Sequence, residues 1–142
     1  MFSCNKTMFN CQGIRFIPHR GLVLWCDFAG YRAAEIGDKV RPAIIVSPWK
    51  FNRQTAYVVP VSQADSWSTS LDIQFPAGRY PFFTPGIDQW AKTQLLTHVE
   101  LARLDRMRIG ERWCTPAIGA ADLRRVLDAL TSIFSDAQSL AA

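Results

Sequence analysis

Short apolar runs, separated by glycine, proline and polar clusters, dominate the first hundred residues of the chain. Runs rich in β-branched and aromatic residues cover 21–28, 41–47 and 55–61, which is typical of β-strands. The run over 41–47 lacks alternation, which indicates a strand covered on both faces. Residues 71–75 alternate apolar and polar positions, as a half-buried antiparallel strand does, and 90–99 are predicted as one further strand.

The pattern changes to a helical period near the C-terminus. Between 121 and 134 apolar residues recur at spacings of three and four, which predicts an amphipathic helix. Asp122 falls in its first turn, where a negative charge suits the helix dipole. Residues 100–107 are predicted as a short helical turn and 110–116 as a turn. The expected fold is therefore mainly β with a C-terminal helix, in the form of a small antiparallel barrel closed by that helix.

The length of 142 residues indicates a single domain that buries a real core without disulfides. Residues 1–18 have no clean period, so we expect a loosely attached N-terminal extension there. The domain is expected to span 19–136, followed by a short tail over 137–142. The longest apolar runs are far shorter than a membrane span, and the start of the chain does not resemble an export signal. We therefore expect a cytoplasmic protein.

The four cysteines and two histidines do not form a metal-binding pattern. Cys4, Cys11, Cys26 and Cys114 are scattered, without a Cys-x-x-Cys pair. This spacing predicts free thiols in a reducing compartment and no zinc site or other metal site. We expect no cofactor.

The net charge of +4 and a pI near 9.1 mildly favour a polyanionic partner. Polar and cationic residues from loops and strand ends, interleaved with aromatic residues such as Trp49 and Trp90, suggest a phosphate-and-stacking surface for single strands of nucleic acid. In the alternative interpretation, the aromatic residues are core or dimer contacts and the cations are merely solvated. The candidate RNA-binding residues are Lys39, Lys50, Asn52, Arg53, Gln63, Lys92 and His98.

Two of the candidate residues have specific alternatives. His98 has the intrinsic pKa of a general base near neutrality, but its place in a predicted strand favours a hydrogen-bonded structural histidine. Arg41 opens the buried strand over 41–47, where a rigid backbone carries a side chain to solvent. It is either a solvated arginine or a binding or catalytic cation.

Several segments together resemble the MazF/PemK family of toxin endoribonucleases. These are Gly21-Leu22-Val23-Leu24-Trp25-Cys26-Asp27-Phe28, then Arg41-Pro42-Ala43-Ile44-Ile45-Val46-Ser47-Pro48, then Val58-Val59-Pro60-Val61-Ser62, and finally Trp90-Ala91-Lys92 with Thr97-His98-Val99 and Arg103-Leu104. Their order and spacing cover roughly residues 20 to 135. The resemblance implies a small SH3-like β-barrel of the MazF/CcdB-like toxin type and a bacterial homodimer. It also implies metal-independent cleavage of single-stranded mRNA and a cognate antitoxin, through which alone we expect contact with DNA.

The resemblance also implies roles for three residues. Arg41 is expected to stabilise the charge that develops on the phosphate, because a guanidinium matches two phosphate oxygens and stays charged. Ser62 stands where the family has a threonine; it keeps the hydroxyl and loses the stiff β-branch. Its other interpretation is a hydroxyl that satisfies a turn backbone. Glu35 is expected to polarise the 2′-hydroxyl or bind a base edge, although it lies one residue further from the arginine than the family spacing.

Two rival functions remain open at this point. The same fold also serves CcdB-like toxins that bind DNA gyrase, since a fold does not dictate an activity. The Arg-Pro strand and the hydroxyl after Val-Pro-Val favour the nuclease. The shifted Glu35 and the serine at position 62 favour a non-catalytic barrel that binds RNA or protein.

Overall fold

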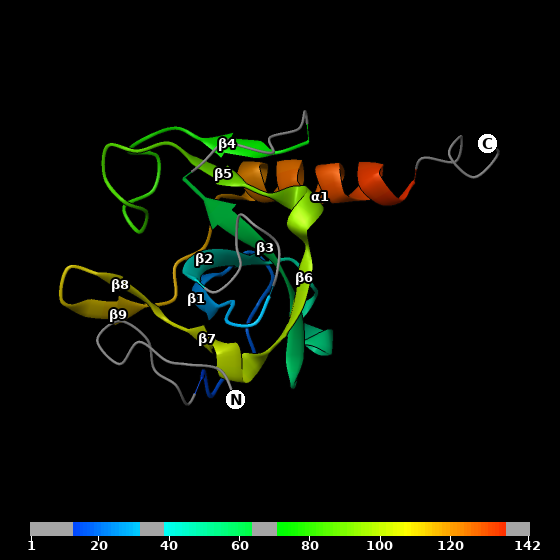
Figure 1. Cartoon of the computed structure of the whole chain (residues 1–142), viewed down its shortest axis with the longest axis horizontal. Coiled ribbons are helices and arrows are strands. Elements are labelled where there is room, and N and C mark those ends of the chain that lie inside the picture. The colour runs from blue at the N-terminus through cyan, green and yellow to red at the C-terminus, as the bar shows by residue number, and fades with distance from the viewer. Residues whose placement is uncertain (1–12, 32–38, 64–70, 136–142) are drawn as a thin grey trace.

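The computed structural model describes residues 13–31, 39–63 and 71–135. Its three longest strands are β1 (Val23–Asp27), β2 (Val40–Ile45) and β3 (Thr55–Ser62), and the chain ends in helix α1 (Ala120–Phe134) (Figure 1). The remaining elements are the strands β4 (Ile73–Phe75), β5 (Gln89–Ala91), β6 (Thr97–Glu100), β7 (Leu104–Asp105), β8 (Met107–Ile109) and β9 (Arg112–Cys114), and the 3₁₀ turns η1 (Trp49–Phe51), η2 (Thr93–Leu95) and η3 (Leu101–Arg103).

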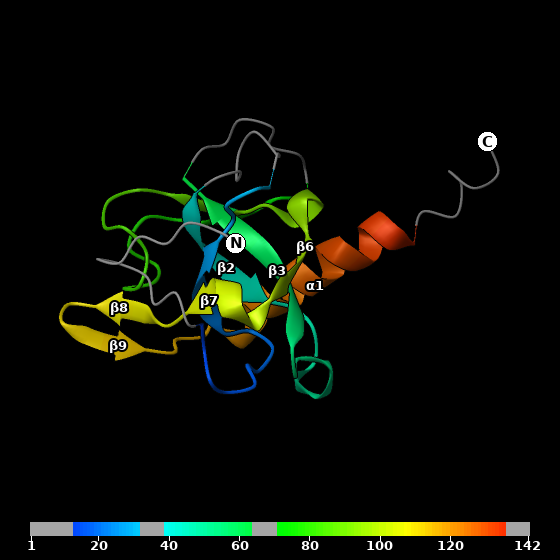
Figure 2. The same ribbon diagram turned by 60° about the horizontal axis from the view of Figure 1, so that its bottom comes forward.

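Seven strands form one antiparallel sheet in the order β4-β5-β3-β2-β1-β7, with β6 as a branch. The branch arises because β6 pairs with the beginning of β3 and β5 with its end. The sheet curls around the core (Figures 1 and 2), and α1 contacts the turn η2 and adds its buried face to the first core cluster. Within the described residues β4 and β7 do not pair, so the barrel stays open. The prediction of a mainly β barrel with a C-terminal helix is confirmed.

Strand β2 has a hydrophobic core on each face. Ile44 lies in the cluster that contacts α1, whereas Ala43 and Ile45 lie in the second cluster, with Phe28 and Leu104. All these residues are fully buried. This explains why the apolar run lacks alternation, since neither face of the strand meets solvent over 43–45, whereas Arg41 and Pro42 before them are half-buried.

The predicted C-terminal helix is confirmed, and one face of it covers the sheet. Val126, Ala129 and Leu130 are buried in the first cluster. Phe134, predicted on the apolar face, is 73% exposed at the last turn. In the described parts of the chain, no helix has the length and apolar character needed to cross a membrane.

The segment after residue 89 differs from the expectation. The single strand predicted over 90–99 is broken into β5, η2 and β6, because β5 and β6 pair with opposite ends of β3 and the chain must bend between them. The hydroxyl of Thr93 holds this bend by donating to the carbonyl of Leu71 at 3.0 Å.

The prediction of a helical turn over 100–107 was only partly right. The turn η3 is followed at once by β7, because Leu104 pairs with Cys26 in β1 and is fully buried. The chain then forms the β8–β9 hairpin, in which Arg108 lies opposite Trp113.

Residues 13–18 pack against the domain, so the expectation of a loosely attached segment was wrong for this part. Gly13 is buried with a φ of +78°, and a Cβ there would lie 2.5 Å from the Cα of Ala102. The carbonyl of Pro18 accepts a hydrogen bond from Asn52 at 3.0 Å. The first twelve residues lie outside the described part of the chain.

Candidate active-site groove

Arg41 and Ser62 lie opposite each other on adjacent strands. The β2–β3 register pairs Ala43 with Pro60, and continuing it by two residues sets Arg41 against Ser62. The Nη1 of Arg41 donates a long hydrogen bond of 3.5 Å to the Oγ of Ser62. Ser62 is only 1% exposed, so its hydroxyl meets the guanidinium inside the protein. The serine therefore helps to position Arg41.

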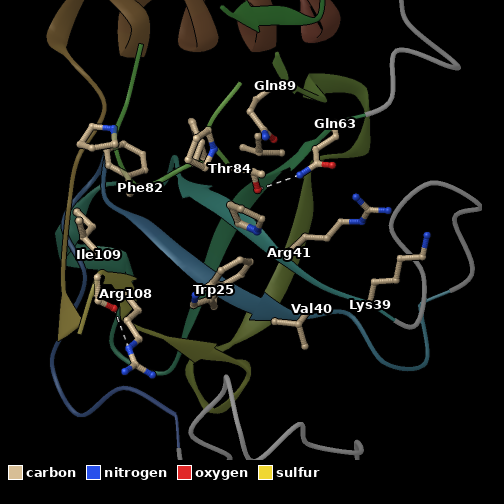
Figure 3. A pocket seen from close by; sticks show the side chains of 16 residues that line it. Trp25, Lys39, Val40, Arg41, Gln63, Phe82, Thr84, Gln89, Arg108 and Ile109 are labelled. Carbon is tan, nitrogen blue, oxygen red and sulfur yellow. Dashed lines mark hydrogen bonds between the residues drawn. The ribbon is translucent and has the colours of Figure 1, made fainter. Parts of the chain in front are cut away.

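Arg41 borders a groove of about 680 Å³ at the end of the sheet (Figure 3). Its wall combines cationic, amide and aromatic side chains, a composition that suits an anion carrying flat rings. The lining residues include Trp25, Lys39, Arg41, Gln63, Phe82 and Arg108.

A buried carboxylate holds the loop that forms one wall of the groove. Asp122, in the first turn of α1, accepts hydrogen bonds from Arg79 and Tyr80, which precede Phe82 in the chain. Burial by itself raises the pKa of Asp122, but the hydrogen bonds from Arg79, Tyr80 and Arg125 outweigh it and hold that pKa below its ordinary value. The carboxylate stays charged at neutral pH.

A second contact in the wall of the groove joins the loop after β4 to the end of β3. The amide Nε2 of Gln63 donates to the Oγ1 of Thr84 at 3.0 Å, across the mouth of the groove (Figure 3). Lys39 is exposed on the side where Arg41 also lies. Among the predicted RNA-binding residues, Lys39 and Gln63 are therefore the two that the fold brings to Arg41.

Three other predicted RNA-binding residues lie at the opposite end of the sheet. Lys50 and Arg53 are exposed in the connection between β2 and β3. The ring of His98 stacks on Tyr57 at 4.5 Å and shares a 2.8 Å hydrogen bond with Thr55. Tyr57 precedes Ser62 by five residues in β3, which is roughly 17 Å along the strand. His98 is therefore a stacked surface residue far from Arg41.

The interior positions of Asn52 and Lys92 correct the expectation that they contact RNA. Asn52 is fully buried and bonded to Ser47 and to the carbonyl of Pro18. Lys92 is 1% exposed, and its ammonium lies 3.4 Å from the carboxylate of Asp72. Both side chains are satisfied by the protein and do not face solvent.

Of the three predicted catalytic residues, Glu35 lies outside the described residues. The thiol of Cys26, next to Arg41 across the β1–β2 pair, is no alternative nucleophile, because burial raises its pKa far above the ordinary range. Within the described segments, no three histidine, cysteine or acidic side chains gather as metal ligands do.

Sequence reasoning missed Arg108 and interpreted Trp25 as a core or dimer residue. Both line the groove. A signal for Arg108 was present, because arginines occur at 106 and 108, within four residues of the turn predicted over 110–116, and at 112 within that turn. Trp25 carried no such signal, since the sequence pattern of a strand is the same whether its tryptophan faces a core or a groove.

The chain matches a family model and several solved structures. A sequence model of the PemK-like, MazF-like toxins of type II toxin-antitoxin systems matches residues 19–134. A search of curated proteins found no match.

Similar solved structures include the MazE-MazF complex (Form-II) from Deinococcus radiodurans, with a TM-score of 0.56 and 20% identity, covering 84% of this chain and 97% of that one. Another is an endoribonuclease in complex with its cognate antitoxin from a Mycobacterial species, with a TM-score of 0.54 and 18% identity over 82% and 91%. A third is the Mycobacterium tuberculosis toxin MazF-mt6, with a TM-score of 0.55 and 11% identity over 78% and 94%. These structures share the fold. Because the family match spans most of the chain, the chain belongs to the PemK-like, MazF-like toxins of type II toxin-antitoxin systems.

Proposed function

We propose that this toxin is an endoribonuclease that cleaves single-stranded mRNA without a metal ion, and that Arg41 is its principal catalytic residue. The observation that carries the proposal is the contact between Arg41 and the buried Ser62 at the edge of a cationic groove. A guanidinium held from inside the protein is pre-organised for a phosphate that enters from the groove, since little reorganisation is needed when charge develops.

In the proposed reaction the 2′-oxygen of the RNA attacks the adjacent phosphorus and the bond from phosphorus to the 5′-oxygen breaks. The 2′-hydroxyl loses its proton, the 5′-oxygen gains one, and the products are a 2′,3′-cyclic phosphate and a 5′-hydroxyl. Arg41 stabilises the extra negative charge on the pentacoordinate phosphate through its planar fork of donors. Glu35 remains the predicted group that polarises the 2′-hydroxyl.

The groove supports binding of a single strand beside Arg41. Lys39 adds a second cation, and the amide of Gln63 adds a donor and an acceptor at the same end of the sheet. The half-buried Trp25 offers aromatic surface for an unpaired base, whereas Phe82 in the same wall is buried against Tyr80 and Phe83. Lys50, Arg53 and His98 lie too far along the strands to touch the same phosphate and remain candidates for flanking nucleotides or for another partner.

We also propose that a cognate antitoxin inhibits this toxin by covering the groove, and that the toxin works as a cytoplasmic homodimer. Two of the similar structures are complexes, MazE-MazF and an endoribonuclease with its cognate antitoxin. Exposed Trp49, Phe51 and Tyr57 supply apolar surface of the kind that subunit interfaces use.

The test is incubation of the purified toxin with single-stranded RNA in EDTA, followed by mapping of the RNA ends. We expect cleavage that survives chelation and leaves a cyclic phosphate and a 5′-hydroxyl. Arg41→Ala is expected to lower the rate by at least ~100-fold, as the loss of a transition-state donor does. Arg41→Lys should recover little of the cleavage rate, because lysine keeps the charge and loses the planar fork of donors.

The matched control is Arg124→Ala, which removes an exposed arginine from α1. It should cleave at the wild-type rate. If the RNA stays intact and growth arrest depends on DNA gyrase, the protein is a gyrase-binding toxin and not a nuclease. Intact RNA without toxicity would favour a non-catalytic barrel.

A further inference from the structure

The β8–β9 hairpin carries the densest positive charge near the groove. Between residues 106 and 113 the sequence holds Arg106, Arg108 and Arg112 against a single acidic residue, Glu111. All three arginines are exposed. Among the described residues, no carboxylate forms an ion pair with any of them. Their charge is therefore available to an external anion.

The hairpin is continuous with the groove that Arg41 borders. Arg108 and Ile109 line it together with Lys39 and Arg41. Figure 3 shows Lys39 and Arg41 on one side of Trp25, and Arg108 and Ile109 on the other. A ligand that spans the groove thus meets a cation at each end and aromatic surface between them.

An exposed tryptophan completes the hairpin surface. Trp113 is 40% exposed, and it lies directly opposite Arg108 in the register. The guanidinium carbons of Arg106 and Arg108 each lie 5.7 Å from the centre of its ring. The Nε of Arg108 also donates to the carbonyl of Gly110 at 3.1 Å, which orients the rest of its fork. Arginines next to an exposed indole are the combination that binds phosphates and unstacked bases of a single strand.

We propose that the β8–β9 hairpin is a second RNA-binding surface that holds the strand on the side of Trp25 away from the scissile phosphate. Arg106 and Arg108 bind backbone phosphates beside Trp113, which stacks on a base. Arg112 lies opposite Ile109, on the other face of the hairpin, and adds to its positive charge. This inference rests on the proposed ribonuclease function. Charge complementarity selects the occupant, because the surface is cationic and aromatic, whereas an apolar protein segment would leave the arginines unpaired.

The test uses a single-stranded oligoribonucleotide that is 2′-O-methylated throughout, so that it binds and is not cleaved. The variant Arg106→Gln/Arg108→Gln/Arg112→Gln should weaken binding at least tenfold. Each phosphate contact on a single strand contributes about 0.7 to the slope of log affinity against log salt. Loss of two to three such contacts in the triple variant should therefore lower that slope by roughly 1.4 to 2.1. Arg124→Gln, an exposed arginine on α1, should change neither quantity.

A second variant separates loss of charge from damage to the hairpin. Arg106→Lys/Arg108→Lys/Arg112→Lys keeps the charges, so it should retain the wild-type salt slope. Wild-type affinity and slope in the glutamine variant would overturn the proposal. If the glutamine variant bound RNA as the wild type does but lost affinity for a polyglutamate peptide, the hairpin would be a site for an acidic protein partner. That result would also overturn the proposal.

Cleavage of an unmodified RNA by the same variants distinguishes this proposal from the proposed function. If cleavage requires Arg41 but proceeds at the wild-type rate in the hairpin variants, only the hairpin proposal is overturned. If RNA binding depends on the hairpin but the protein does not cleave RNA, the proposed ribonuclease function is overturned and the hairpin remains an RNA-binding surface. Absence of both RNA binding and cleavage in the wild-type protein overturns the two together.

Discussion

The Nε of Arg79 donates a 2.7 Å hydrogen bond to the Oδ2 of Asp122, and thereby joins the loop after β4 to the first turn of α1. Tyr80 donates to the same oxygen and accepts from the backbone of Gly119 at 2.7 Å. Asp122 is 1% exposed, so these donors satisfy a buried charge. The carboxylate therefore sets the position of the loop that leads to Phe82 in the groove wall.

Asp122→Asn should destabilise the protein by about 2 kcal/mol, because it removes the charge that Arg79 and Tyr80 are arranged to meet. Denaturant unfolding at pH 7 measures this loss. The control is Asp128→Asn on the same helix, which removes an exposed carboxylate paired with Arg124 and should change stability by less than about 0.5 kcal/mol. Equal effects of the two substitutions would contradict a structural role for Asp122.

The contribution of Asp122 should depend on pH. Its pKa in the folded protein is held below the ordinary value of about 3.9, so the charged form stabilises the fold above that value. This stability is lost as the pH falls through the folded-state pKa. The difference between wild type and Asp122→Asn should accordingly be constant from pH 5 to 7 and shrink below about pH 4. A difference that grew on acidification would have the wrong sign.

Ser62 is predicted to act through its hydroxyl on Arg41. Ser62→Thr should retain most of the cleavage, since the hydroxyl remains and the family carries a threonine there. Ser62→Val has nearly the shape of threonine without the hydroxyl, and should lower kcat about tenfold, which corresponds to roughly 1.4 kcal/mol. Single-turnover cleavage of one RNA by the two variants compares them at matched volume. Equal rates for valine and threonine would exclude a role for the hydroxyl.

Lys92 is predicted to stabilise the fold and not to bind RNA. Lys92→Met leaves Asp72 buried without its cation and should cost about 3 kcal/mol. The double variant Lys92→Met/Asp72→Leu replaces both charges and should recover most of that loss. At a temperature where all variants are folded, RNA affinity should stay within about twofold of wild type. A large loss of affinity in the folded double variant would return Lys92 to the RNA-binding residues.

A glycine is predicted to be required at position 13, because the backbone there lies close to the backbone of Ala102. Gly13→Ala combines a φ of +78° with a Cβ only 2.5 Å from the Cα of Ala102, so it should destabilise by well over about 1 kcal/mol. Gly78 has nearly the same φ, +83°, with open space around it. Gly78→Ala should cost only the backbone strain, on the order of 1 kcal/mol. Thermal unfolding of the two variants isolates the clash, and equal costs would argue against packing of residues 13–18.

Local signals were sufficient for the three longest strands, for the C-terminal helix and for selecting Arg41 as a candidate site residue. The unbroken apolar run of β2 reflects two cores that meet on one strand, and the period of three and four in α1 reflects a single buried face. Arg41 stood out because it opens the first of these elements. By contrast, the break between β5 and β6 carried no local signal, because it depends on both strands pairing with β3.

By itself the sequence determined the three longest strands, the helix and the candidate cation at the start of β2, since these depend on periods of a few residues. Only the tertiary structure decided which residues accompany Arg41. The antiparallel register sets Ser62 beside it and sends Lys50 and Arg53 to the far end, and the fold buries Lys92 against Asp72. It also brings Arg108 to the groove from far along the chain. The physical reason is that burial and proximity arise from strand pairing, which a linear pattern of polar residues does not encode.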